Sequence, residues 1–257
     1  MLYEDLSKEY IKPSRLIGNL YFVGLYNAST HIFDTGEGLI LLDPGYLEGL
    51  SMVLDNIKAL GFDAKDIKYI LVSHAHLDHM DAVKPLVSMT GAKTFIGKDD
   101  MPLLRGEIFH YPINPFEPDV LLSDGDVVTL GNTSIRCLST PGHTDGTMSF
   151  FFDVTENGVT YKAGMFGGAG CNTLYKEFLD KYSLPYEMRQ KYLNSVLRLR
   201  TEEVDVFVGN HVWNNNTDGK IAALATSEKN PFIVPGEWQA FLEGRLAAIE
   251  KIIRDND

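Results

Sequence analysis

The stretch Ser73-His-Ala-His-Leu-Asp-His79 contains three of the seven histidines in this chain of 257 residues. His74 and His76 are two positions apart at the end of an apparent buried strand, so both side chains can point to the same side. Asp78 and His79 follow where the chain must turn into the next helix, which can aim them at a neighbouring point. Imidazole nitrogen and carboxylate oxygen suit Zn²⁺. The stretch therefore predicts a metal site, and the alternative is a run of surface histidines.

Two further histidines lie at the ends of other predicted strands. His143 lies in Thr140-Pro-Gly-His-Thr-Asp-Gly146, where proline and glycine predict a tight turn. His211 ends the apolar stretch Val206-Phe-Val-Gly-Asn-His211. Either histidine taken alone is also consistent with an ordinary surface residue. Together with the first cluster, they supply two more imidazoles for the same metal site.

Apolar patterns around these motifs predict alternating strands and helices. Because strands and helices interleave throughout, we expect an α/β architecture of sheets covered by helices. No shift in composition divides the chain, so residues 1–257 are expected to form a single domain. Prolines among aromatic residues at 107–118 predict a long irregular loop, and Trp238 is expected in the core. The expected strands are 15–23, 31–34, 39–43, 67–73, 94–96, 127–130, 133–138, 147–152, 159–161 and 206–208, and the expected helices are 50–60, 81–89, 185–197 and 238–253.

The composition limits the class of protein. A hydrophobic share of 44% with 23% charged residues is typical of a soluble globular enzyme. The net charge of −12 argues against a nucleic-acid partner, because binding a polyanion requires a basic face. No apolar run reaches the roughly 18 residues of a membrane helix, and two cysteines are too few for a disulfide framework. The chain as given is expected to be cytoplasmic, or periplasmic or secreted if a leader has been removed.

The motif His-x-His-x-Asp-His after a strand resembles the metal motif of the metallo-β-lactamase superfamily. Three further segments fall in the family's order, namely Leu42-Asp43-Pro-Gly, Thr140 to His143 and Asp205 to His211. Segments at 109–112 and 230–238 resemble parts of the third subclass of class B metallo-β-lactamases. The resemblance covers nearly the whole chain, from about Ile11 to the C-terminal helix.

This resemblance implies a fold and a set of metal ligands. The fold would be an αββα sandwich of two mixed sheets with outer helices and the metals at one rim. Two Zn²⁺ ions are implied. Asp43 would orient a ligand. The alternative for Asp43 is a structural role, as an aspartate that starts a turn before Pro-Gly. The resemblance assigns His74, His76 and His143 to the first zinc and Asp78, His79 and His211 to the second.

The implied chemistry is hydrolysis of a small molecule. Three protein ligands for each zinc leave open positions, and a metal-bound hydroxide would attack the carbonyl of a small cyclic amide such as a β-lactam. Asp78 would orient the nucleophile. A first alternative is a dizinc hydrolase of a lactone or other ester. A second is a non-hydrolytic diiron or metal-binding protein, which His76 disfavours because flavodiiron-type enzymes typically carry glutamate at that position. The net charge disfavours a nuclease.

The sequence departs from the family in the stretch at 163–172. It holds no acidic residue there, which favours the β-lactamase branch over glyoxalase-II-like thioesterases. The third-subclass enzymes usually place two serines in this stretch, whereas Gly168 and Gly170 stand here, widening the expected site and keeping the ester alternative open. The sequence does not settle the oligomeric state. Further candidates for the substrate pocket are His110, Tyr111 and Phe116 in the proline-rich loop and Trp213 after His211.

Overall fold

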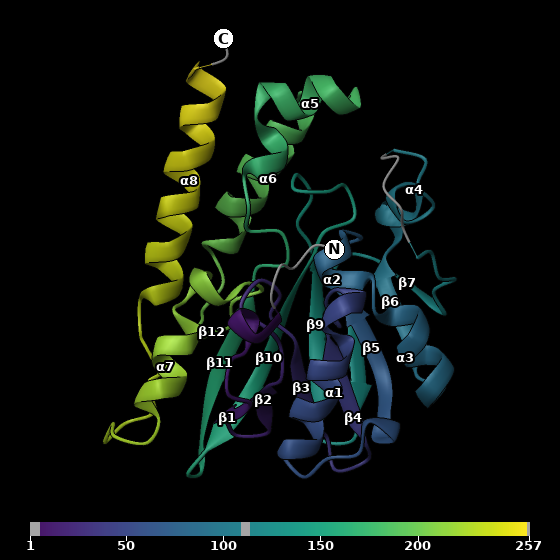
Figure 1. The fold of residues 1–257 in the computed structure, drawn as a ribbon. Coiled ribbons are helices and arrows are strands. Elements are labelled where there is room, and N and C mark those ends of the chain that lie inside the picture. The colour runs from purple at the N-terminus through teal and green to yellow at the C-terminus, as the bar shows by residue number, and fades with distance from the viewer. Residues whose placement is uncertain (1–5, 109–113, 256–257) are drawn as a thin grey trace.

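A computed structural model describes residues 6–108 and 114–255, and Figure 1 shows their arrangement. The N-terminal half forms a seven-stranded sheet in the order β1 to β7. Its first four strands pair antiparallel, and β4 to β7 pair parallel. Its strands are β1 (Ser14–Ile17), β2 (Leu20–Phe22), β3 (His31–Asp34), β4 (Leu39–Leu42), β5 (Ile67–Val72), β6 (Lys93–Gly97) and β7 (Val120–Leu122).

The second sheet has five strands in the order β12-β11-β10-β9-β8, with only β11 and β12 parallel. Both sheets are therefore mixed. The strands are β8 (Val127–Leu130), β9 (Thr133–Ser139), β10 (Met148–Glu156), β11 (Val159–Met165) and β12 (Val206–Phe207). The α-helices are α1 (Leu50–Ala59), α2 (Leu77–Met80), α3 (Val83–Thr90), α4 (Met101–Leu104), α5 (Lys176–Tyr182), α6 (Glu187–Leu199), α7 (Thr217–Ala223) and α8 (Glu237–Asp255). Short 3₁₀ turns are η1 (Leu6–Glu9), η2 (Leu47–Gly49), η3 (Ala64–Asp66), η4 (Lys98–Asp100), η5 (Asn172–Leu174) and η6 (Val212–Asn214).

The two sheets pack face to face through apolar side chains that alternate along their strands. In β4, Ile40 and Leu42 face the second sheet, whereas their neighbours in the strand face outward. In β10, Phe150 and Phe152 face the first sheet, while Phe151 faces outward. This alternation explains why β4 is buried at every position. A strand with apolar residues on both faces requires cover on both faces.

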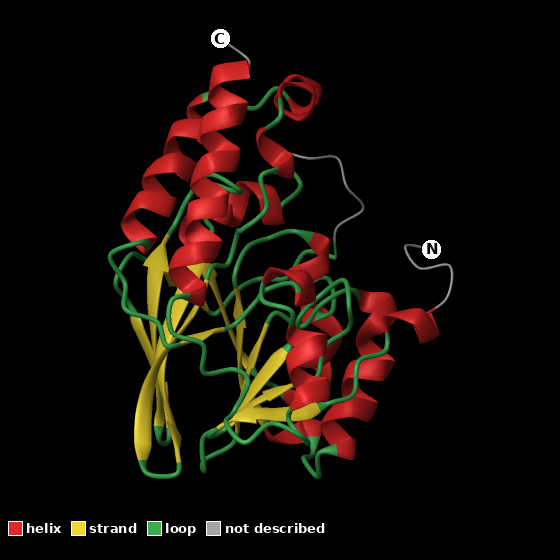
Figure 2. Ribbon diagram, turned by 90° about the vertical axis from the view of Figure 1, so that its left-hand side faces the viewer, coloured by secondary structure: helices red, strands yellow, loops and turns green. Residues whose placement is uncertain are grey.

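Helices supply that cover on the two outer faces, as Figure 2 shows. Val53 and Ile57 of α1 and Leu86 of α3 pack on the outer face of the seven-stranded sheet. Helices α6 and α8 pack on the other sheet through a cluster that includes Tyr192 and Trp238. The four layers confirm the predicted αββα sandwich. Among the described residues, no helix is both long and apolar enough to span a membrane.

The helix predicted at 81–89 differs from the one observed. Helix α3 begins at Val83, and a separate short helix, α2, lies directly before it. Pro85 is tolerated because it lies in the first turn of α3. A backbone N–H in this turn has no hydrogen-bond partner within the helix, so proline removes no helical hydrogen bond. Helices α5 and α7 were not predicted, since both are only seven residues long.

Trp238 anchors α8 to the sandwich, and its replacement by alanine is expected to be strongly destabilising. The side chain is 1% exposed, contacts Phe151 and Phe207, and donates from Nε1 to the Leu199 carbonyl at 3.1 Å. Trp238→Ala should lower the free energy of unfolding by about 3–5 kcal/mol in urea titrations. The control Trp213→Ala, at a site 53% exposed, should cost less than about 1 kcal/mol. Equal losses in the two variants would contradict this assignment.

Candidate metal centre

The residues that the sequence places at strand ends meet at one rim of the sandwich. Strands β4 and β5 are parallel, so Asp43 and His74 leave the sheet at the same edge. Strand β12 runs parallel to β11 and brings His211 to the same rim. His143 follows β9, in a turn whose Gly142 has φ 135°, and a Cβ at Gly142 would lie 2.4 Å from Tyr192. The fold therefore converts four separate strand ends into one cluster.

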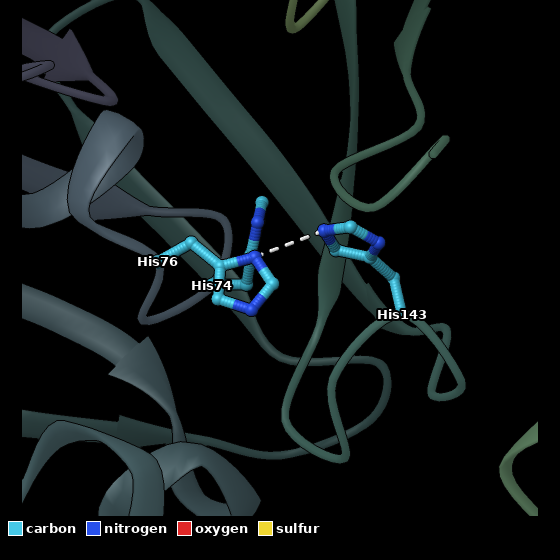
Figure 3. A group of neighbouring side chains, drawn as sticks. All are labelled: His74, His76 and His143. Carbon is cyan, nitrogen blue, oxygen red and sulfur yellow. Dashed lines mark hydrogen bonds between the residues drawn. The ribbon is translucent and has the colours of Figure 1, made fainter. Parts of the chain in front are cut away.

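Six side chains form two adjacent groups of possible metal ligands. In each group, one ligand atom from every residue lies within 4.8 Å of the others. In the first group, His143 Nε2 faces His76 Nδ1 at 3.0 Å, as Figure 3 shows. In the second group, Asp78 Oδ2 lies 3.2 Å from His79 Nε2 and 3.5 Å from His211 Nε2. The ring centroids of His74 and His79 are 4.2 Å apart, so the groups lie side by side. The first group is His74, His76 and His143, and the second is Asp78, His79 and His211.

Hydrogen bonds from Nδ1 fix the orientation of two of these rings through one buried carboxylate. Asp43 accepts from His79 Nδ1 at 2.8 Å and from the Ser73 hydroxyl at 2.7 Å. Because that hydroxyl donates to Asp43, His74 Nδ1 must donate to the Ser73 oxygen, 3.1 Å away. His74 Nε2 is buried and has no hydrogen-bond partner among the described residues. A buried nitrogen lone pair aimed at a cluster of ligands is suited to a cation.

Backbone carbonyls orient two more rings in the same way. His143 Nδ1 donates to the Gly170 carbonyl at 2.8 Å, and His211 Nδ1 donates to the Asn27 carbonyl at 2.9 Å. Both contacts put the N–H on the outer side of the ring and leave Nε2 as an acceptor facing the cluster. This arrangement fits zinc, which binds neutral imidazole nitrogen and carboxylate oxygen.

The electrostatics of the cluster also suit a divalent cation. Burial lowers the pKa of His76 and of His211 to about 4, and it lowers the pKa values of His74 and His143 as well. Burial opposes the charged forms of Asp78 and His79, but their mutual attraction is stronger. This attraction holds the pKa of Asp78 below its ordinary value. Together with the attraction of Asp43, it raises the pKa of His79 to about 10. Carboxylates that favour a proton on His79 favour a bound cation in its place.

A cleft of about 790 Å³ opens onto both groups. Gly170 and Trp213 line it, and Trp213 stacks on His211 with ring centroids 4.5 Å apart. Asn214, which sequence reasoning also placed at the rim after His211, lines the cleft as well. Sequence reasoning did not identify Asn172 of η5, Phe178 of α5 or Arg245 of α8, because the positions of these elements depend on tertiary packing.

The structure places two of the predicted pocket residues, Phe116 and Gly168, outside the lining of the cleft, and two others cannot be compared with it. Phe116 is 9% exposed and does not line the cleft. It packs in the core between the seven-stranded sheet and the helices that cover it. Gly168 is buried behind His143, where a Cβ would lie 2.7 Å from the His143 Cβ, so it permits close packing instead of widening the cleft. His110 and Tyr111 lie outside the described residues.

Asp100, which sequence reasoning missed, joins the two loops that carry the first group. Its carboxylate accepts from the backbone N–H of Ala75 at 2.8 Å and of Gly146 at 2.7 Å, and from the Thr144 hydroxyl at 3.0 Å. Burial raises the pKa of Asp100 to about 6, against the opposing effect of these donors. Ala75 lies between His74 and His76, and Thr144 follows His143, so Asp100 sets the spacing of the three histidines of the first group.

Replacing Asp100 with alanine should therefore reduce both stability and metal affinity. The change leaves two buried N–H donors without an acceptor, which should lower the free energy of unfolding by about 3 kcal/mol. Urea unfolding and zinc titration measure the two effects. Asp99→Ala is the matched control, because Asp99 is exposed in the same 3₁₀ turn. If the two variants behave alike, Asp100 does not hold the loops together.

Comparison with known proteins identifies relatives over most of the chain. A family model described as the metallo-beta-lactamase superfamily matches residues 23–156, which is more than half of the chain. The structure is similar to that of BJP-1, a subclass B3 metallo-beta-lactamase of Bradyrhizobium japonicum, with a TM-score of 0.86 and 28% identity, covering 98% of this chain and 97% of that one. FEZ-1 metallo-beta-lactamase from Legionella gormanii gives a TM-score of 0.89 and 27% identity, covering 96% and 97%.

Curated relatives match over shorter stretches. The probable polyketide biosynthesis zinc-dependent hydrolase PksB of Bacillus subtilis is 31% identical over 114 residues, which are 44% of each chain. The chain thus spans less than half the length of this relative. A hydroxyacylglutathione hydrolase of Francisella philomiragia is 26% identical over 192 residues, covering 71% of this chain and 67% of that one.

Proposed function

The chain belongs to the metallo-β-lactamase superfamily, and on that premise we propose that it is a binuclear zinc hydrolase of small cyclic amides, with β-lactams as the leading class. The observation that carries the proposal is the pair of adjacent three-residue groups at the floor of an open cleft. Three ligands per metal leave room for water and substrate, as in catalytic zinc sites. In this proposal, His74, His76 and His143 hold one zinc, and Asp78, His79 and His211 hold the other.

When bound, zinc supplies Lewis acidity, which activates water at neutral pH and polarises a carbonyl group. The chain's own residues hold the ligand atoms in place. Asp43 keeps the proton of His79 on Nδ1 through the 2.8 Å contact, and the Asn27 carbonyl does the same for His211. In the metal-bound state, with the cation in place of the second proton of His79, both rings would therefore present an unprotonated Nε2 toward the second metal position.

Asp78 is the residue we assign to orienting the attacking water. Its side chain is 22% exposed, borders the cleft, and has a pKa held below its ordinary value. With Oδ2 directed at the second group, the other carboxylate oxygen is left to accept a hydrogen bond from water. An ionised carboxylate in this position aligns the water's lone pair with a carbonyl carbon above it.

The size and charge of the molecule support a small-molecule substrate. A cleft of about 790 Å³ falls in the range of small-ligand sites. The net charge of −12 disfavours a nucleic-acid substrate. The similarity to BJP-1 and FEZ-1 over nearly the whole chain supports β-lactams.

A dizinc hydrolase of lactones or other esters is the second candidate. Gly170 borders the cleft without a side chain that could donate to a substrate. The match to a hydroxyacylglutathione hydrolase over 71% of the chain also favours this alternative.

A substrate panel separates the two candidates. The purified protein is assayed with the chromogenic cephalosporin nitrocefin, a γ-lactone and a hydroxyacylglutathione thioester, with its zinc and iron content measured in parallel. Zinc-dependent turnover of nitrocefin above the other substrates supports the first proposal. Turnover restricted to the lactone or thioester supports the second. Iron in place of zinc, without any hydrolysis, contradicts both.

A further inference from the structure

His211 receives less support from the sheets than the other histidine of its group. It follows β12, which has only two residues and lies at the edge of the five-stranded sheet. The His211 side chain is 18% exposed, whereas that of His79 is 1% exposed. The position of the His211 ring must therefore be fixed by contacts from outside its own strand.

A loop from the N-terminal part of the chain supplies one of these contacts. The Asn27 carbonyl accepts from His211 Nδ1 at 2.9 Å. Asn27 is held in turn by Glu9, the last residue of η1, because the Glu9 carboxylate accepts from the Asn27 N–H at 3.1 Å. The Glu9 carbonyl also accepts from the Tyr26 N–H at 2.9 Å. Glu9 thus fixes the backbone directly before the carbonyl that orients His211.

Trp213 holds the face of the same imidazole ring. It stacks on His211 with ring centroids 4.5 Å apart and an angle of 8° between the planes. It also contacts the ring of Tyr26, with centroids 5.9 Å apart. Because Tyr26 directly precedes Asn27, the stacking side chain and the hydrogen-bonding carbonyl support each other. We call Glu9, Tyr26, Asn27 and Trp213 the His211 clamp.

We propose that Glu9 and Trp213 are positioning residues, which raise the metal affinity of the second group by holding the His211 ring in place. The proposal rests on the proposed function only in taking Asp78, His79 and His211 as the ligands of one zinc. A ring that is already ordered loses little conformational freedom when it binds a cation, so the clamp should strengthen binding. Because His211 belongs to the second group alone, the first group should keep its affinity.

The order of the ring can be measured by NMR relaxation in metal-free protein that carries isotope-labelled histidine. The His211 ring should be ordered in the wild type and more mobile in Glu9→Ala and in Trp213→Leu. Neither substituted side chain is buried, so both variants should fold. Glu9→Gln and Trp213→Phe should keep most of the order, because the glutamine oxygen still accepts a hydrogen bond and phenylalanine still offers a ring face.

Glu48→Ala is the matched control for the change in charge. Glu48 is an exposed glutamate of the 3₁₀ turn η2, and its replacement should leave the His211 ring ordered. A ring that is mobile in the wild type, or equally ordered in all variants, would overturn the proposal.

Zinc titration of the metal-free protein measures the consequence for binding. Loss of a partner that orients a metal-bound histidine lowers metal affinity about 10- to 100-fold. Trp213→Leu should therefore weaken the second zinc by about tenfold, and Glu9→Ala, which acts one contact further from the ring, by about three- to tenfold. In a His211→Ala background, neither substitution should have a further effect, because both act through that ring. An equal loss for both zincs, or a loss that persists without His211, would contradict the clamp.

Failure of the clamp can be distinguished from failure of the proposed function. If the variants loosen the ring and weaken the second zinc, but the wild type hydrolyses no substrate of the panel, the clamp stands and the hydrolase assignment fails. If turnover depends on zinc while ring order and zinc affinity are unchanged in Glu9→Ala and Trp213→Leu, the hydrolase stands and the clamp is overturned. Binding of a single zinc by the wild type would overturn both the two-metal assignment and the role of the clamp in metal affinity.

Discussion

Replacing His76 with alanine is expected to lower the hydrolytic rate by at least about a thousandfold. A zinc ion contributes several kcal/mol to the stabilisation of a transition state, and each tenfold in rate corresponds to about 1.4 kcal/mol. In our proposal His76 Nδ1, which faces His143 Nε2 at 3.0 Å, is one of the three ligand atoms of the first group. Removing one of three protein ligands should empty this position or leave it loosely held. The initial rate of nitrocefin hydrolysis measures the effect.

His76 is the most informative ligand to replace because its loss should leave the fold intact. The side chain is only partly buried, whereas His74 is 1% exposed. Thermal unfolding of His76→Ala should therefore resemble that of the wild-type protein without metal. A folded variant that keeps the full rate and a full complement of zinc would show that His76 does not hold the metal.

Replacing Asp43 with alanine should give the second-largest effect, on both metal binding and stability. Asp43 is 1% exposed and accepts from His79 Nδ1, from the Ser73 hydroxyl and from the Ser73 N–H, at 2.7 to 2.8 Å. Without it, three donors lose their acceptor, and His79 loses the contact that fixes its tautomer. Loss of such an orienting partner lowers metal affinity about 10- to 100-fold. Removing one member of a buried charged pair should lower the free energy of unfolding by about 3 kcal/mol or more.

Asp43→Asn separates the role of the carboxylate from that of the backbone. Asp43 has φ 50°, a conformation that asparagine tolerates and alanine disfavours. Asparagine should therefore recover much of the stability, but its amide cannot accept from all three donors, so the zinc affinity should stay low. Zinc titration and urea unfolding of both variants measure the two effects separately. Wild-type zinc affinity in Asp43→Asn would rule out the orienting role.

The clustering of the candidate metal ligands was predictable because the strand-end pattern is local. His74 and His76 directly follow the strand Ile67–Val72, and a parallel sheet brings its strand ends to one edge. The burial of β4 on both faces was also predictable from local sequence, because its run of apolar residues is continuous. The layered sandwich followed from these patterns together with the family resemblance.

The walls of the cleft were not predictable because they depend on contacts distant in sequence. Arg245 reaches the cleft only because α8 packs across the second sheet through Trp238. Gly168 was assigned to the cleft from its position in the chain, whereas packing places it behind His143. Phe116 follows a proline-rich stretch that favours a surface loop, yet burial of its ring in the core outweighs that local preference.

The most direct test of the two-metal assignment is a crystal structure of the zinc-loaded protein with diffraction measured at the zinc absorption edge. The anomalous map should contain two peaks, one among His74, His76 and His143 and the other among Asp78, His79 and His211. Each should lie about 2.0–2.2 Å from its ligand atoms. Zinc bound elsewhere, or the absence of any peak within these two groups, would contradict the assignment.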